Sequence, residues 1–163
     1  MKNWQWNEKK LARLLAIYGG DKDALQLAKC ITLISHFYDD LIDRDKPLDD
    51  AAIHAGMWQA LIELPANPFY CTHIKKLWPL MAGAIFDYRA SNDLAKLEEP
   101  PRAREIANVT RFSLAVVLIF IAGLCGGQEH AGAYAGEIRL MAQDDALREW
   151  LEEVTSGETQ AQS

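Results

Sequence analysis

The densest group of residues able to do chemistry in this sequence is the run of aspartates that follows Tyr38. Six of the twelve residues from Asp39 to Asp50 are aspartates, and only Arg44 and Lys46 offset their charge. Clustered carboxylates without histidine or cysteine among them favour hard cations, above all Mg²⁺. The run therefore predicts a magnesium site.

The spacing of the first three aspartates indicates which of them share a site. Asp39 and Asp43 are four residues apart, so on a helix their carboxylates lie on one face. Asp40 lies about 100° around the helix and can reach the same ion from the side, or a second ion beside it. Aspartates at a helix C-terminus are destabilising, because their negative charge lies at the negative end of the helix dipole. Residues that destabilise a local element are often part of a functional site. We expect these three residues to be metal ligands.

Magnesium in proteins keeps several waters and is usually held by one or two carboxylates together with substrate phosphates. A diphosphate-bearing small molecule or a nucleotide is therefore the expected ligand of the cluster. The alternative interpretation is a solvated helix end. For Asp49 and Asp50 that interpretation is preferred, because aspartates are common turn and cap residues.

Several basic residues are candidates for contacting phosphate. Arg44 and Lys46 follow the first three aspartates directly. Arg104 and Arg111 are seven residues apart on one face of a predicted helix, where they can bind phosphate or form ordinary salt bridges. His36 is interpreted as a core residue rather than a ligand. Asp87 and Asp93, which lie on the fourth predicted helix with Arg89 and Asn92, could complete such a site or simply face solvent.

Glycine, proline and capping residues divide the chain into helices, and strand signals are scarce. Asp21 is a natural N-cap, Pro47 ends the helix that follows it, and Pro79 should kink or split another. The expected helices cover about residues 4–18, 22–46, 51–64, 69–97, 102–124 and 129–154. The sequence therefore predicts an all-α, single-domain bundle of about six helices at residues 1–154, and a disordered polar tail at 155–163.

Composition narrows the functional classes. The net charge of −6 argues against a nucleic-acid partner. The run from Leu114 to Gly127 carries no charge but is shorter than the ~20 residues a membrane span needs, so it predicts a helix buried on all sides. We expect a cytoplasmic protein without a membrane span, and a homo-oligomer that covers leftover apolar surface. Three cysteines lack zinc-ligand spacing and are expected to be free, mostly buried thiols: Cys30, Cys71 and Cys125.

The stretch from Asp39 to Asp43 fits the DDxxD motif, and here the sequence resembles the class I isoprenoid (terpenoid) synthase fold, in particular the trans-isoprenyl diphosphate synthases. A second stretch, residues 133–150, is similar to the helix that carries that family's second aspartate-rich motif, and contains Gln143, Asp144 and Asp145. The resemblance implies a minimal isoprenoid-synthase-like bundle in which the apolar helix at 102–124 is central.

The resemblance also implies a chemistry. Asp39 and Asp43, supported by Asp40, and Asp144, with Asp145, would hold Mg²⁺ against a substrate diphosphate, and the metal would help the allylic carbon–oxygen bond to ionise. The second and sixth helices would then run side by side around one cavity. Its apolar lining would come from the fifth helix: Val116, Val117 and Phe120.

Departures from the family pattern keep three functions open. The tandem arginines that follow the family's first motif are absent, and Arg148 stands at the third aspartate position of the second. The first function is Mg²⁺-dependent binding or turnover of an isoprenoid-type diphosphate, with enzyme activity left open. The second is a non-catalytic helical interaction protein that forms a homodimer. The third is a helical nucleotide pyrophosphohydrolase, for which only Glu149 and Glu152 offer the required spacing.

Overall fold

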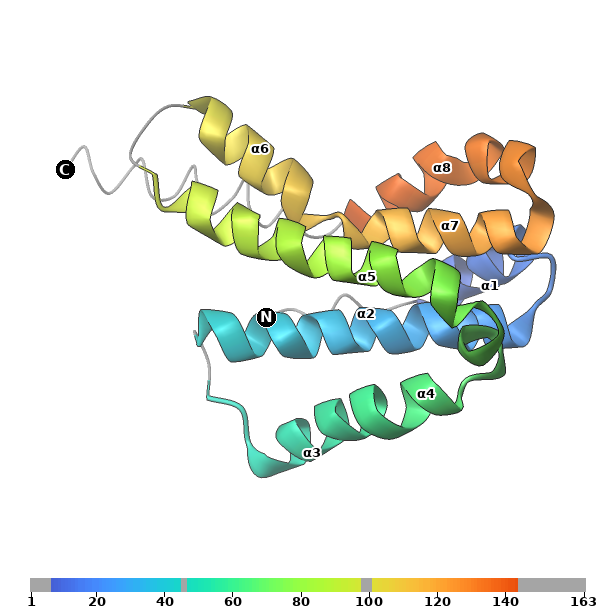
Figure 1. Cartoon of the computed structure of the whole chain (residues 1–163), viewed down its shortest axis with the longest axis horizontal. Coiled ribbons are helices and arrows are strands. Elements are labelled where there is room, and N and C mark those ends of the chain that lie inside the picture. The colour runs from blue at the N-terminus through green and yellow to red at the C-terminus, as the bar shows by residue number, and fades with distance from the viewer. Residues whose placement is uncertain (1–6, 45–46, 98–100, 144–163) are drawn as a thin grey trace.

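The structure, a computed structural model of the chain, describes residues 7–44, 47–97 and 101–143. These residues form α-helices and one π-helical turn, and no strand occurs among them (Figure 1). The prediction of an all-α bundle is therefore confirmed.

In chain order the elements are α1 (Glu8–Ile17), α2 (Lys22–Asp43), α3 (Asp50–Trp58), the π-helical turn η1 (Gln59–Glu63), α4 (Leu64–Ala66), α5 (Pro68–Ala95), α6 (Pro101–Arg111), α7 (Leu114–Gly126) and α8 (Gln128–Gln143). α3, η1 and α4 follow one another without a break, and only two residues separate α6 from α7. The six predicted helices are recognisable in this order.

The ends of α2 follow from local sequence. Gly19 and Gly20 adopt φ angles of 66° and 84°, a region that glycine enters without steric cost, and they stop α1. Asp21 then caps α2, because its side chain accepts a hydrogen bond from the backbone N–H of Ala24 at 2.9 Å. At the other end Arg44 turns into the left-handed conformation with φ 54°. This places the aspartate run in the last turns of α2.

The predicted fifth helix differs from the prediction in two ways. It is divided by a turn at Phe112 and Ser113, and α7 is not buried on all sides, since Val116 is 38% exposed. The residues of α7 that do lie in the core share one face: Ala115, Val117, Leu118, Ile121 and Ala122. Within the described residues, the stretch Arg102–Gly126 is the one helical segment long and apolar enough to cross a bilayer by length and composition. α5, by contrast, continues unbroken through Pro79.

The core lies where α7 meets α1, α2, α5 and α8 (Figure 1). Tyr18 ends α1 in this core, and its hydroxyl donates a hydrogen bond to the carbonyl of Leu118 at 3.2 Å. Its buried polar atom is therefore satisfied, as burial requires. The largest other fully buried side chains are Leu14, Ile17, Leu27, Leu77, Leu118, Ile121 and Ile138.

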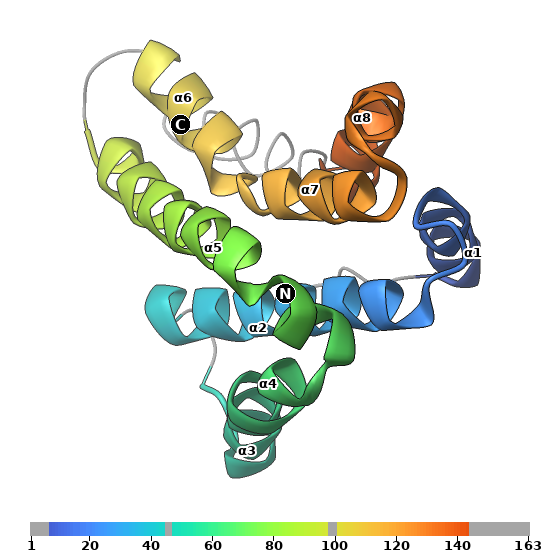
Figure 2. The same cartoon turned by 45° about the vertical axis from the view of Figure 1, so that its right-hand side comes forward.

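The described part of the sixth predicted helix does not run along α2. α8 packs on α7 and on α1, and α7 lies between α8 and α2 in both views (Figures 1 and 2). Arg13 of α1 binds Glu137 of α8 through Nε at 2.6 Å and Nη2 at 2.8 Å, and lies over the ring of Tyr134. The expectation that these two helices run side by side is therefore wrong for the residues described.

Gly56 fixes how closely α3 approaches α2. A Cβ atom at this buried glycine would overlap the ring of Phe37. Gly56→Ala should therefore lower the free energy of unfolding by about 2 kcal/mol, because the ring cannot move out of a packed contact without strain. Urea unfolding followed by circular dichroism measures the change.

Gly83→Ala is the matched control, because a Cβ at Gly83 of α5 meets no atom within 4 Å. It should stabilise the protein by up to ~1 kcal/mol through helix propensity. Equal effects of the two substitutions would show that the contact with Phe37 is not a constraint.

Candidate functional site

Three helices bring polar side chains together at the C-terminal end of α2. Asp39 and Asp43 lie on its last turns, on the side that α5 approaches with Tyr88. α6 packs along α5 and ends at Arg111, because the chain turns at Phe112 and Ser113. The turn that divides the predicted fifth helix thus brings an arginine to the aspartates.

A single nitrogen atom joins the two carboxylates. Nη2 of Arg111 donates to Oδ1 of Asp39 at 2.8 Å and to Oδ2 of Asp43 at 2.8 Å. The hydroxyl of Tyr88 donates to Oδ1 of Asp39 at 2.6 Å and lies 3.3 Å from Oδ1 of Asp43. Nη1 of Arg111 makes a longer contact of 3.5 Å with Oδ1 of Asn92. The two carboxylates therefore converge on one cationic atom, and a phenol holds Asp39.

The site is partly buried, which strengthens these interactions. The side chains of Asp39, Asp43 and Arg111 are 21%, 37% and 38% exposed. Burial raises the pKa of Tyr88, and its hydrogen bond to Asp39 raises it further, so the phenol remains a donor. Burial alone would lower the pKa of Arg111, but its interactions with Asp39, Tyr88 and Asp43 together outweigh burial and the pKa is raised. The arginine therefore stays charged.

Aromatic rings line one side of the cluster. The guanidinium of Arg111 lies 5.4 Å from the centroid of the Tyr88 ring. Tyr38, just before the aspartates, meets Tyr88 edge-on with the ring centroids 5.4 Å apart. Both contacts limit the positions open to Tyr88. The cluster is held by packing as well as by charge.

The structure brings together some of the predicted site residues. Asp39 and Asp43 lie together as their spacing predicts, and Arg111 joins them, although its partners are carboxylates. Asp40 lies on the neighbouring face of α2, and its backbone carbonyl accepts a hydrogen bond from the backbone N–H of Arg44 at 3.4 Å. The side chain of Arg44 is exposed. Three predicted site residues lie outside the described part of the chain: Lys46, Asp144 and Asp145.

Sequence reasoning did not identify Tyr88. It selected residues on either side of it, but Asp87 accepts a hydrogen bond from Ser113 and Asp93 is exposed. The available signal was the four-residue spacing of Tyr88 and Asn92, which places both on one face of α5. The sequence does not show that this face lies against Asp39 and Asp43, because that depends on how α5 packs on α2.

His36, interpreted as a core residue, lies partly buried one turn before Asp39. Burial lowers its pKa below 6.5, and the charges of Asp39 and Asp40 oppose that shift only in part. The folded protein therefore binds fewer protons than the unfolded chain just below that pH. The free energy of unfolding should fall as pH drops through and below about 6.5, and the contribution should be complete above it.

Urea unfolding between about pH 5 and 7.5 tests this dependence on His36. His36→Gln removes the titrating group and should reduce the pH slope of the unfolding free energy. His54→Gln is the control, since His54 is exposed. An unchanged slope in His36→Gln would assign the pH dependence to other groups.

The donor set fits a small site for a hard cation. Within residues 7–44, 47–97 and 101–143, no group of three or more His, Cys, Asp or Glu side chains is gathered where it could hold a metal. Asp39 and Asp43 form a two-carboxylate pair instead. One or two carboxylates, completed by water and phosphate oxygens, is the set that Mg²⁺ commonly uses.

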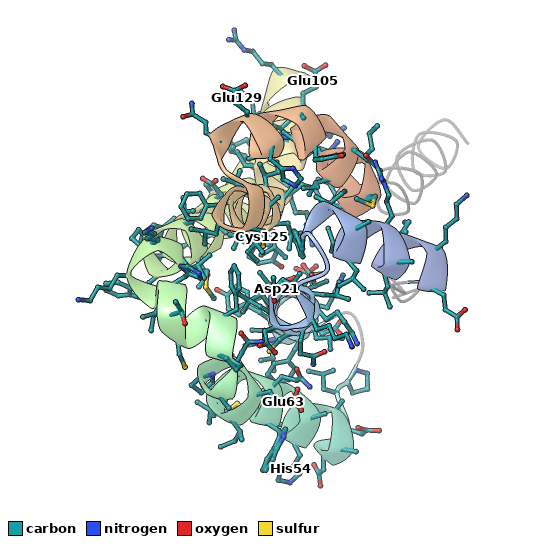
Figure 3. The ribbon with its side chains drawn as sticks, turned by 90° about the vertical axis from the view of Figure 1, so that its right-hand side faces the viewer. Asp21, His54, Glu63, Glu105, Cys125 and Glu129 are labelled. Carbon is teal, nitrogen blue, oxygen red and sulfur yellow. The ribbon has the colours of Figure 1, made fainter. Side chains whose placement is uncertain are left out.

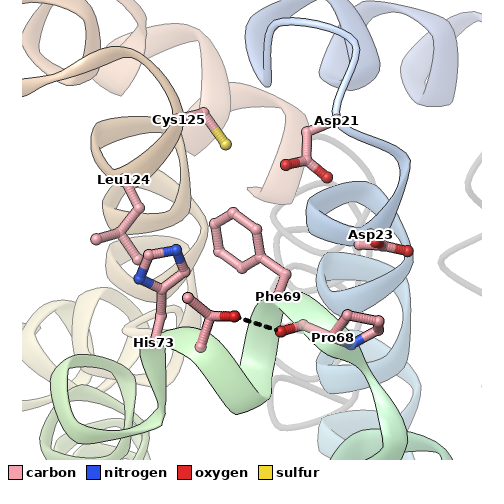
Figure 4. A pocket seen from close by; sticks show the side chains of 8 residues that line it. Asp21, Asp23, Pro68, Phe69, His73, Leu124 and Cys125 are labelled. Atoms are coloured by element: carbon pink, nitrogen blue, oxygen red, sulfur yellow. Dashed lines mark hydrogen bonds between the residues drawn. The ribbon is translucent and has the colours of Figure 1, made fainter.

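Val116 and Val117 do not line the apolar cavity that was expected beside the fifth predicted helix. Val117 is fully buried in the core, whereas Val116 is 38% exposed, so the two do not line one cavity. An open hollow of about 360 Å³ lies elsewhere, between the start of α2, the start of α5 and the end of α7 (Figure 4). It is lined by Asp21, Asp23, Pro68, Phe69, Thr72, His73, Leu124 and Cys125.

The polar groups of this hollow serve the fold. Asp21 caps α2, and the hydroxyl of Thr72 donates to the carbonyl of Pro68 at 2.9 Å. Asp21 and Cys125 face one another across the hollow (Figures 3 and 4). Burial raises the pKa of Cys125 to about 11, so its thiol is neutral and a poor nucleophile at neutral pH. The hollow contains none of the predicted site residues.

Comparison of the chain with protein-family models, with curated proteins and with solved structures found no match.

Proposed function

We propose that the chain binds Mg²⁺ together with a diphosphate-bearing, isoprenoid-type small molecule at Asp39 and Asp43. One observation carries the proposal: Oδ1 of Asp39 and Oδ2 of Asp43 each lie 2.8 Å from the same nitrogen of Arg111. The pair is thus arranged to share one cationic centre. Magnesium accepts this kind of oxygen pair and takes its remaining ligands from water and phosphate.

Arg111 has a part in both states of this site. Without a ligand it neutralises the two carboxylates. With magnesium and a diphosphate present, its planar guanidinium would turn to the phosphate oxygens, for which two parallel hydrogen bonds are favourable. Arg44, just past the aspartates, adds positive charge nearby. Tyr88 would keep Asp39 in position throughout, because its hydroxyl proton is already committed to that carboxylate.

The ion would supply Lewis-acid chemistry at the leaving diphosphate. The side chains of the site bind and orient, and none of those described is placed as a general base. We therefore propose binding as the primary function, with any turnover depending on the metal.

Calorimetry with MgCl₂ and pyrophosphate tests this function. The wild-type protein should bind pyrophosphate in the presence of Mg²⁺, and Asp39→Asn/Asp43→Asn should lose at least tenfold in affinity. Asp49→Asn/Asp50→Asn removes the same charge next to the site, and asparagine preserves the N-cap at Asp49. That control should bind as the wild type does. No heat in the wild type, or equal losses in both variants, would reject the site.

A second candidate function is a non-catalytic helical interaction protein that forms a homodimer. The observation that favours it is the exposure of large apolar side chains on several helices. Trp58, Trp78 and Phe86 are 58%, 67% and 71% exposed. Single exposed apolar residues are ordinary, but contiguous ones mark interaction surfaces. The pyrophosphohydrolase alternative gains no support from the residues described, since Glu149 and Glu152 lie outside them.

A further inference from the structure

Residues 50–66 form an arm, made of α3, η1 and α4, that projects from one side of the bundle. The arm packs on α2 and, through α4, on the start of α5. Figures 1 and 2 show no described helix on its far side. Gly56 is the one residue of α3 that is fully buried. The outer side of the arm therefore has no partner among the described residues.

Large apolar side chains cover this outer side. Ile53, Met57 and Leu61 recur at four-residue intervals and are 38%, 45% and 61% exposed. Trp58 and Ile62 lie beside them and are 58% and 46% exposed. Residues four apart share a helix face, so the five form one continuous surface, here named the outer stripe.

The outer stripe carries no charge. The charged residues of the arm are Asp50, at its first turn, and Glu63. Glu63 is half-buried and points to the side of the arm that faces α2, whereas His54 lies on the outer side (Figure 3). A helical surface made of isoleucine, leucine, methionine and tryptophan, with His54 as its one titratable residue, is unusual on a protein exposed to water.

We propose that the outer stripe is the interface of a homodimer in which it packs against the same stripe of a second copy. This proposal rests on the second candidate function, the homodimer, and adds the location of its interface. It does not depend on the magnesium site. A chain with a net charge of −6 repels a second copy over most of its surface. Two uncharged stripes related by a two-fold axis bring no like charges together. The stripe is therefore a surface on which charge repulsion does not oppose self-association.

The area is that of a small dimer interface. Half-exposed side chains of this size each present on the order of 100 Å². The five stripe residues therefore supply ~500 Å², and their exposed neighbours extend it toward the ~800 Å² per partner of a standard interface. The neighbours on the arm are Ala51, Ala55 and Pro65.

The symmetry predicts which residues meet. In a two-fold interface the residues at the centre of the patch pack against their own copies. Met57 and Trp58 lie at the middle of the stripe, so each would lie near the axis. Leu61 would then lie against Ile53 of the partner subunit. A buried tryptophan at such a centre is typical of the residues that dominate binding energy.

Sedimentation at tens of micromolar tests the proposal. The wild-type protein should sediment as a dimer, and Leu61→Glu should weaken the dimer at least tenfold, because it places a carboxylate in the apolar interface. Phe86→Glu is the matched control. It puts the same charge at a more exposed apolar residue, 71% exposed on α5, and should leave the dimer intact. Circular dichroism of both variants should show the helical content of the wild type.

The possible outcomes distinguish the homodimer itself from the outer stripe as its interface. A wild-type monomer would reject both the homodimer and the outer stripe as its interface. A wild-type dimer that survives Leu61→Glu would reject the stripe alone. A dimer broken by Phe86→Glu but not by Leu61→Glu would assign the interface to α5. None of these results bears on pyrophosphate binding by Asp39 and Asp43.

Discussion

Arg111→Met should lower the free energy of unfolding by about 2 kcal/mol and raise the affinity for Mg²⁺ alone. The substitution leaves Asp39 and Asp43 facing one another without a counter-ion. The cost should fall between the ~1 kcal/mol of an exposed ion pair and the 3–5 kcal/mol of breaking a buried one, because the three side chains are partly exposed. Magnesium then binds better because it no longer competes with the guanidinium.

The same variant should bind pyrophosphate less well in the presence of Mg²⁺, since a phosphate contact is lost. Urea unfolding and calorimetry measure the two effects separately. Arg104→Met, an exposed arginine on the same helix, is the control and should change neither. A stable Arg111→Met that binds both ligands as the wild type does would remove Arg111 from the site.

Asn67→Ala should lower the free energy of unfolding by about 3 kcal/mol. Asn67 is 6% exposed and joins two elements. Its Oδ1 accepts the backbone N–H of Tyr70 at 2.8 Å, which caps α5, and its Nδ2 donates to the carbonyl of Asp23 at 3.0 Å. Alanine would leave the buried backbone N–H of Tyr70 without its cap, and would remove a hydrogen bond that the carbonyl of Asp23 accepts in addition to its bond within α2. The substitution removes a cap and a link between α5 and α2 together.

Chemical denaturation with Asp49→Ala as the control tests this role. Asp49 caps α3 in the same way, with Ala52 N–H at 2.7 Å, but that hydrogen bond is exposed. Its loss should cost about 1 kcal/mol. Equal costs for the two caps would show that the link to Asp23 contributes nothing.

Local chemistry was sufficient to predict most helix ends. Asp21 and Asp49 both act as N-caps, and Gly19 and Gly20 stop α1, as the sequence indicated. The division between α6 and α7 was missed because Phe112 and Ser113 carry no glycine or proline signal. That turn follows from packing α6 on α5 and α7 in the core, which are contacts between distant parts of the chain.

The candidate site shows the same limit. The pairing of Asp39 with Asp43 depends only on helix geometry, so their spacing predicted it. Tyr88 and Arg111 reach them from 49 and 72 residues away from Asp39. The spacing of Arg104 and Arg111 left a phosphate contact or a salt bridge open for Arg111, and only the register of α5 and α6 on α2 shows that it pairs with Asp39 and Asp43.

Paramagnetic broadening of backbone amide signals in nuclear magnetic resonance tests whether Asp39 and Asp43 bind the metal. Mn²⁺ takes the place of Mg²⁺, and pyrophosphate is present. Both ions prefer oxygen ligands, so Mn²⁺ should occupy the same site. The signals of Asp39, Asp43 and Arg111 should broaden first, and Asp39→Asn/Asp43→Asn should abolish the effect. Broadening centred on Asp49 and Asp50, or none at the end of α2, would contradict a magnesium–diphosphate site at this aspartate pair.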